Sequence, residues 1–172
     1  MVGAALWSGC GSSSPVSAVL SNADLPASLG LKQNNSDAAQ NLAKVFNQTY
    51  PGCVGHYAVF TLQGRSPSPV LTGKTIYPQV FSESATCGSS AKAQSVFAEV
   101  SKKVTKFGAS SVSGIGDSAF LARSKSKTAN SYVIFWRDGA VLASVQLSGP
   151  VGNKKISVAE TKLLARRQVG HR

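Results

Sequence analysis

The chain has 172 residues, of which 42% are hydrophobic and 15% are charged, and 18 Lys and Arg against 7 Asp and Glu give a net charge of +11. This composition is typical of a folded domain with a core and excludes a highly charged disordered tail. No apolar run reaches the roughly 18 residues that a membrane-spanning helix needs, so the sequence predicts no such helix. The positive charge favours acidic partners: anionic lipid headgroups, cell-wall polyanions or nucleic acid.

The first ten residues carry the pattern of a bacterial lipobox, in which a cysteine receives a diacylglycerol and becomes the mature N-terminus. A short apolar stretch leads to Gly9 and Cys10, and a Gly/Ser-rich run follows. We therefore expect residues 1–10 to be the remnant of a lipoprotein signal peptide and Cys10 to be lipidated. Residues 11–18 are expected to form a flexible tether, and 19–172 a single extracytoplasmic domain held at the cell membrane. The run before Cys10 lacks Lys and Arg and is short for a signal peptide, so an unmodified cysteine remains the alternative.

The cysteine count agrees with lipidation. Three cysteines leave one unpaired in an oxidising compartment. With Cys10 acylated, Cys53 and Cys87 form an even pair, and their disulfide would stabilise the fold by about 4 kcal/mol in the chain-entropy model. Two buried free thiols are the alternative.

The region up to residue 81 predicts one helix and two strands. Pro26 makes residues 19–31 an extended or turn segment. Ser36 is a natural N-cap for a helix that ends before Pro51-Gly52. Aromatic and β-branched residues predict strands over 56–62 and 70–81, the second an edge or bulged strand because Pro78 lies inside it.

A second helix is predicted over residues 90–107, with Ser89 or Ser90 as its cap and Gly108 at its end. Its apolar residues recur at helical spacing: Ala93, Val96, Phe97, Val100, Val104 and Phe107. Three lysines lie near its C-terminal end, where cations suit the helix dipole: Lys102, Lys103 and Lys106.

The C-terminal third predicts three strands and a last helix. Residues 118–122 follow a glycine-rich turn, and Asp138-Gly139 between 132–136 and 140–147 is a strong hairpin signal. Ser157 and Glu160 form a capping-box pattern for a helix that runs to Gly170. Together these elements predict an α+β fold: an antiparallel sheet of about five strands, with about three helices on one face or at its ends.

Catalytic patterns are weak. His171 is penultimate and is expected to be disordered. Cys53 and His56 could form a thiol–imidazole pair, although a disulfide cysteine beside a partly exposed histidine is the simpler interpretation. There is no Gly-x-Ser-x-Gly elbow and no metal-ligand spacing. The pattern Gly114-x-Gly116-Asp117 precedes a strand, so it predicts a tight turn with Asp117 bonded to nearby amides rather than a phosphate loop. We expect no enzyme activity, cofactor or metal.

Two candidate binding surfaces can be named. Trp136 and Arg137, near the hairpin tip, could form a small exposed contact patch, and the lysines of the second helix could contribute to a basic surface. A basic surface that is simply solvated is the alternative. Nucleic-acid binding is not expected, because no basic-aromatic pattern of a known module is present.

Four phrases in their order resemble the small lipoproteins and extracellular sensor domains of actinobacteria, including mycobacterial ones: ADLP (23–26), GIGDSA (114–119), FWRDGAV (135–141) and ETKLLAR (160–166). The resemblance implies an antiparallel sheet flanked by helices, with disulfides, at the cell envelope. Most such domains have no assigned activity, and some are similar to the ligand-sensing modules of receptor kinases.

The sequence therefore predicts a non-enzymatic lipoprotein that binds an anionic lipid, a cell-wall polymer or an envelope protein. A carrier of a small apolar ligand, held between the sheet and the second helix, is the first alternative. A hydrolase that uses Cys53 or a serine is the second.

Overall fold

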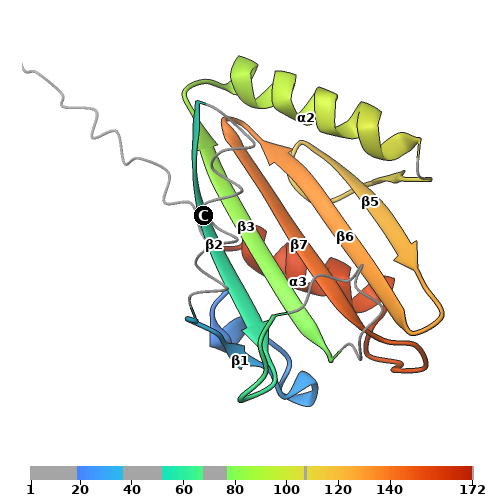
Figure 1. Cartoon of the computed structure of the whole chain (residues 1–172). Helices are drawn as coiled ribbons and strands as arrows, with labels where there is room; N and C mark the ends of the chain where they lie inside the picture. The colour runs from blue at the N-terminus through green and yellow to red at the C-terminus, as the bar shows by residue number, and fades with distance from the viewer. Residues whose placement is uncertain (1–18, 37–51, 68–76, 107, 172) are drawn as a thin grey trace, which may run out of the picture.

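A computed structural model describes residues 19–36, 52–67, 77–106 and 108–171. They form one antiparallel sheet with helices on both faces (Figure 1). The strand order is β1-β2-β3-β7-β6-β5-β4, and the predicted α+β class is confirmed. The strands are β1 (Lys32–Gln33), β2 (Cys53–Thr61), β3 (Gln79–Cys87), β4 (Ser110–Val112), β5 (Ser118–Lys125), β6 (Ala129–Asp138) and β7 (Val141–Pro150). The helices of the described residues are the 3-10 helices η1 (Asn22–Asp24) and η2 (Ala27–Leu29) and the α-helices α2 (Ser90–Thr105) and α3 (Val158–Val169).

The element counts differ from those predicted. The two additional strands, β1 and β4, are short and lie at the two edges of the sheet. The helix predicted from Ser36 to Pro51 lies outside the described residues beyond Ser36 itself. None of the described helices is long and apolar enough to cross a membrane.

The helices lie on opposite faces of the sheet, which corrects the expectation that they share one face or lie at the ends. Helix α3 lies behind the sheet and α2 lies at the upper ends of the strands (Figure 1), where Phe97 packs against Phe135 on the other face. The neighbouring residues Phe135 and Trp136 explain this arrangement, since successive side chains of a strand point to opposite faces. Phe135 packs in the core beneath α2 and Trp136 in the core beneath α3, so both faces need a cover.

Strand β3 differs from the strand predicted over 70–81. It begins at Gln79, directly after Pro78, and continues to Cys87, while residues 70–76 lie outside the described residues. Because β3 is flanked by β2 and β7, it needs backbone donors on both sides, and proline supplies none. The stretch from Ser82 to Thr86 has no large apolar side chain to signal a strand, and its burial comes from the neighbouring strands.

The predicted disulfide between Cys53 and Cys87 is confirmed. Cys53 is the first residue of β2 and lies opposite Cys87, the last residue of β3, with their Cα atoms 4.0 Å apart. Cys87 also precedes α2. The bond therefore joins two neighbouring strands at the end of the sheet that α2 covers.

The larger core lies between the sheet and α3. Trp136 and Leu164 are fully buried in it, and the N-terminal described segment adds four leucines: Leu20, Leu25, Leu29 and Leu31. The Leu20 amide donates a 2.9 Å hydrogen bond to Ser82 Oγ on the inner strand β3, and Arg167 of α3 donates to the Asp24 carbonyl. The segment predicted as extended or turn is thus an integral part of this core.

The smaller core lies beneath α2. The Phe97 ring stacks on Phe135 with centroids 5.6 Å apart, and Phe120 completes the aromatic group. Ser89 caps the helix by accepting a hydrogen bond from the Lys92 amide. Ala93, Val96 and Phe97 of the predicted apolar stripe are therefore core, as a helical period predicts. Val100 and Val104 are half-buried, and Phe107 lies outside the described residues.

The turns and the C-terminal cap largely follow the sequence. Asp117 accepts a 2.9 Å bond from the Gly139 amide and pairs with Arg137 at 2.9 Å, which confirms its bond to a nearby amide. Gly116 has φ +54°, and a Cβ there would lie 2.5 Å from the Arg137 carbonyl oxygen. Ser157 accepts from the Glu160 amide, but the Glu160 Oε1 atom has no partner among the described residues. Only the serine half of the predicted capping box is confirmed.

Candidate functional site

The histidines do not assemble a catalytic pair in the described part of the chain. Cys53 is bonded to Cys87, and His56, three residues further along the same strand, points to the opposite face. His171, which was expected to be disordered, contacts Asp24 Oδ1 at 2.6 Å through Nε2. Burial acts to raise the pKa of Asp24, yet hydrogen bonds from Ser21 and His171 hold it below its usual value. This contact fastens the end of the chain to the N-terminal segment.

No described cluster of three or more His, Cys, Asp or Glu side chains could hold a metal ion.

The predicted contact patch of Trp136 and Arg137 is wrong. Trp136 is 0% exposed and packs in the core beneath α3. Arg137 is mostly covered, pairs with Asp117 and also donates to the Gly139 carbonyl. The hairpin alternation places the tryptophan inside, and its arginine neighbour stabilises the turn.

The three lysines of α2 lie on exposed positions of its C-terminal part. Lys103 forms a 2.7 Å ion pair with Glu99, as the four-residue spacing predicts. Lys102 and Lys106 are one helical turn apart and line a shallow hollow with Ser101 and Thr105. No ion pair occupies these two lysines within the described ranges.

A second depression, here called the basic groove, runs between α2 and strands β5 and β6. Its volume is about 440 Å³, and its lining consists of Val104, Ala122, Arg123, Ser124, Lys125, Ser131 and Val133. The valines and the alanine are half-buried and supply an apolar floor, while Arg123 and Lys125 are exposed. No acidic residue is part of this lining.

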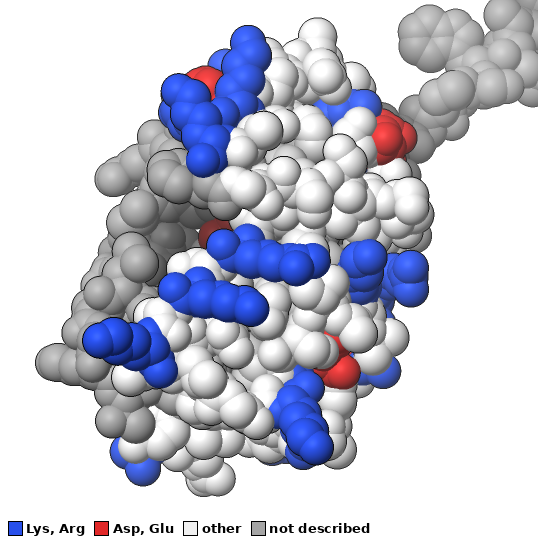
Figure 2. All heavy atoms as spheres, turned by 90° about the vertical axis from the view of Figure 1, so that its right-hand side faces the viewer, with Lys and Arg blue, Asp and Glu red and all other residues white. Residues whose placement is uncertain are grey.

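The face that carries β5 and the end of α2 is rich in positive charge. Figure 2 views this side and shows Lys and Arg side chains spread over it, with only small areas of acidic surface. Arg123 and Lys125 form no ion pair with any described residue. An apolar floor with a cationic rim suits an anion that also carries apolar groups.

A half-buried carboxyl lies on the same face of the sheet, at Glu83 of β3. Ser144 Oγ donates a 2.8 Å hydrogen bond to its Oε2 atom, and Tyr57 lies opposite Glu83 on β2. Burial raises the pKa of Glu83 to about 7, although bonds from Ser144 and Tyr57 act to lower it. Burial and the nearby carboxylate also raise the pKa of Tyr57. Glu83 therefore titrates near neutral pH.

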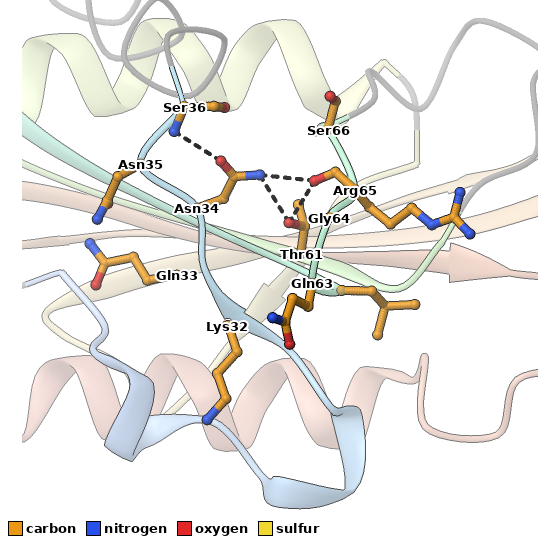
Figure 3. Close-up of a pocket in the computed structure, with 11 residues that line it drawn as sticks. Lys32, Gln33, Asn34, Asn35, Ser36, Thr61, Gln63, Gly64, Arg65 and Ser66 are labelled. Carbon is orange, nitrogen blue, oxygen red and sulfur yellow. Dashed lines mark hydrogen bonds between the residues drawn. The ribbon is translucent and has the colours of Figure 1, made fainter.

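A polar cleft of about 360 Å³ lies at the other edge of the sheet, between residues 32–36 and 61–66 (Figure 3). The Asn34 amide donates to Thr61 Oγ1 at 3.0 Å and to the Arg65 carbonyl at 2.9 Å, and its oxygen accepts from the Ser36 amide at 2.9 Å. These bonds join the two walls of the cleft.

Comparisons with protein-family models, with curated proteins and with solved structures find no match to this chain.

Sequence reasoning located the lysines of α2 but missed Glu83 and the polar cleft. Glu83 lay beyond the predicted end of its strand, so its burial was not expected. The amide-rich run Gln33-Asn34-Asn35 was a visible signal for the cleft, yet such a run is equally typical of an ordinary loop.

Proposed function

We propose that this chain is a non-enzymatic, extracytoplasmic lipoprotein, anchored through Cys10, whose basic groove binds anionic lipid headgroups of the membrane that holds it. The basic groove carries the proposal, because it combines a cationic rim, an apolar floor and no acidic lining residue. Each Lys or Arg near an anionic membrane contributes about 1 kcal/mol of attraction.

The disulfide supports the compartment, and the length of the tether supports closeness to the membrane. The Cys53–Cys87 disulfide is typical of oxidising compartments, and it leaves Cys10 as the odd cysteine available for a lipid. The ten residues from Cys10 to Leu20 can span at most about 35 Å when fully extended. A domain on such a tether stays close to the membrane surface.

The apolar-ligand alternative receives less support from the packing. The stripe residues Ala93, Val96 and Phe97 are buried against Phe120 and Phe135, so they serve as core beneath α2. A hydrolase based on Cys53 is disfavoured because its sulfur is bonded to Cys87.

The test is sedimentation of the full chain, with Cys10→Ser so that no lipid contributes, with vesicles of phosphatidylglycerol or of phosphatidylcholine. We expect binding to the anionic vesicles only, and weaker binding at high salt because exposed charges are screened. The groove variant reverses the two groove cations and Lys106 of the adjoining hollow on α2 (Lys106→Glu, Arg123→Glu and Lys125→Glu), and it should bind about tenfold less tightly or worse.

The matched control reverses the same number of charges on the other side of the molecule: Lys154→Glu, Lys162→Glu and Arg166→Glu. It should bind the vesicles more tightly than the groove variant. Equal losses in both variants would remove the groove from the proposal, and binding to a purified cell-wall polyanion but not to vesicles would assign the surface to the polymer. Intact mass of the protein made in a bacterial host tests the anchor separately: cleavage before Cys10 with an added diacylglycerol is expected, and an unmodified chain would refute it.

A further inference from the structure

Strand β5 has an open outer edge along its second half. It pairs with β6 over its whole length, but β4 pairs with its other side only over residues 119–121, as Figure 1 shows. Residues 122–125 therefore have no strand on their outer side within the described ranges, and the last three of them are exposed. An open strand edge is a template on which an extended peptide can pair.

The hairpin between β5 and β6 identifies the backbone groups that point away from the sheet. The Ser126 amide donates to the Ala129 carbonyl at 2.8 Å, so this amide points toward β6. Successive residues of a strand direct their N–H and C=O groups to alternate sides. Ser124 therefore also faces β6, while Arg123 and Lys125 direct their backbone groups to the open side. The edge thus presents donors and acceptors at every second residue.

The side chains of this edge fall into two sets of different chemistry, because successive side chains of a strand point to opposite faces. Ala122 lies beside Val133 of β6 and lines the basic groove with Val104 of α2. Arg123 and Lys125 form the alternate set, and neither has an ion-pair partner within the described part of the chain. A strand added here would place its side chains alternately beside the apolar floor and beside the two cations.

Charge disfavours two other occupants of this edge. A second copy of the chain would bring its own Arg123 and Lys125 to the contact, and like charges opposite one another destabilise a strand pair. The sequence has no two acidic residues at positions i and i+2, so no segment of the chain itself is complementary. A partner of opposite charge is the occupant that the edge favours.

We infer that the open edge of β5 takes up an extended acidic segment of a partner protein as an additional strand, in which acidic and apolar residues alternate. The acidic side chains pair with Arg123 and Lys125, and the apolar ones cover Ala122 and the groove floor. The inference goes beyond the proposed function, because a lipid headgroup uses the charges of this edge but not its backbone. Since both ligands need the same two cations, a bound strand and a membrane surface would exclude one another here.

The test is ¹⁵N NMR of the full chain, with Cys10→Ser, titrated with a peptide of three Glu-Val repeats between glycines. The control peptide has three Glu followed by three Val, so its charge and composition match but its residues do not alternate. With the alternating peptide, we expect hydrogen exchange of the Arg123 and Lys125 amides to slow about fivefold or more, because a bonded amide must open before it exchanges. The Ser124 amide already faces β6 and should keep its rate.

Two variants at one position separate the backbone from the charge. Lys125→Pro removes the outward N–H, which an edge strand tolerates, whereas Lys125→Gln removes the same charge and keeps the N–H. We expect Lys125→Pro to bind the alternating peptide about fivefold more weakly than Lys125→Gln. Vesicle sedimentation of the two should be equal, because membrane attraction depends on the charge. Failure here is therefore distinguishable from failure of the proposed function.

Charge reversal tests the sign of the partner. Arg123→Glu with Lys125→Glu should lose the Glu-Val peptide and bind the corresponding Lys-Val peptide instead. Lys154→Gln, in the exposed turn after β7, is the control and should bind as the parent does. Unchanged exchange of the Arg123 and Lys125 amides at millimolar peptide would overturn the inference. Equal protection by the two Glu peptides would do the same, since it would reduce the edge to a site of general charge attraction.

Discussion

The two faces of the sheet cover different kinds of polar group, one neutral and one ionisable, as two neighbouring residues of β3 show. Ser82 faces α3 and belongs to a neutral network, in which it accepts from the Leu20 amide and donates to Gln168 Oε1, both at 2.9 Å. Glu83 faces the α2 side, where Ser144 and Tyr57 surround its carboxyl. The first group is satisfied without charge, while the second loses stability when it ionises. The Glu83 site should therefore respond to pH near neutrality, whereas the Ser82 network should not.

The cores beneath the two helices also differ, in their size and in what stabilises them. The α3 side buries Trp136, Leu164 and the four leucines of the N-terminal segment. The α2 side has a smaller aromatic core, and the Cys53–Cys87 bond lies within it. We expect the α2 side to depend on its cross-link and the α3 side to depend on packing.

The largest expected effect comes from removing the disulfide. In a Cys10→Ser background, Cys53→Ser with Cys87→Ser should lower the free energy of unfolding by about 4 kcal/mol, because the closed loop no longer restrains the unfolded chain. Urea denaturation measures the loss. Hydrogen exchange should rise first in α2, and equal loss of protection in α2 and α3 would contradict the contrast between the faces.

The next effect is the pH dependence of Glu83. Its pKa is about 7 in the fold against an ordinary 4.5, so the fold favours the protonated form. No penalty exists below about pH 4.5, and the penalty grows as the pH rises to about 7 and then levels at about 3 kcal/mol. Glu83→Gln should therefore stabilise the protein at about pH 8 and leave it nearly unchanged at about pH 4, as measured by thermal unfolding.

The control for Glu83 is Glu99→Gln. Glu99 is exposed, and its bond from Lys103 lowers its pKa rather than raising it, so this variant should not gain stability at high pH. The contradicting result would be a parent protein whose free energy of unfolding, relative to that of Glu83→Gln, does not fall between mildly acidic and mildly basic pH. It would show that ionisation of Glu83 costs the fold no stability.

The smallest expected effect is on the α3 side. Ser82→Ala leaves the Leu20 amide and Gln168 Oε1 without their partner, at a cost of about 1–3 kcal/mol. Because neither group titrates, the loss should be the same at each pH. Chemical denaturation at two pH values tests this, and a loss that changes with pH would mean that the two faces are coupled through β3.

The sequence by itself determined the features that rest on local patterns. Ser89 and the apolar stripe predicted α2, Asp138-Gly139 predicted the hairpin, and cysteine parity predicted the Cys53–Cys87 bond. The small-residue turn at Gly116 and Asp117 was also predictable, because its requirements lie within a few residues of chain. Lipidation of Cys10 and the extracytoplasmic location remain predictions.

Tertiary structure decided the features that depend on what covers a residue. An alternating strand shows which side chains share a face but not which face is buried, so Trp136 was predicted at the surface although it lies in the core. The same reason hid the covered strand after Phe81 and the environment of Glu83. The polar cleft joins segments about 30 residues apart through Asn34, and no local pattern reports such a contact. Burial and long-range hydrogen bonds are properties of the assembled sheet, and they define both candidate sites of this protein.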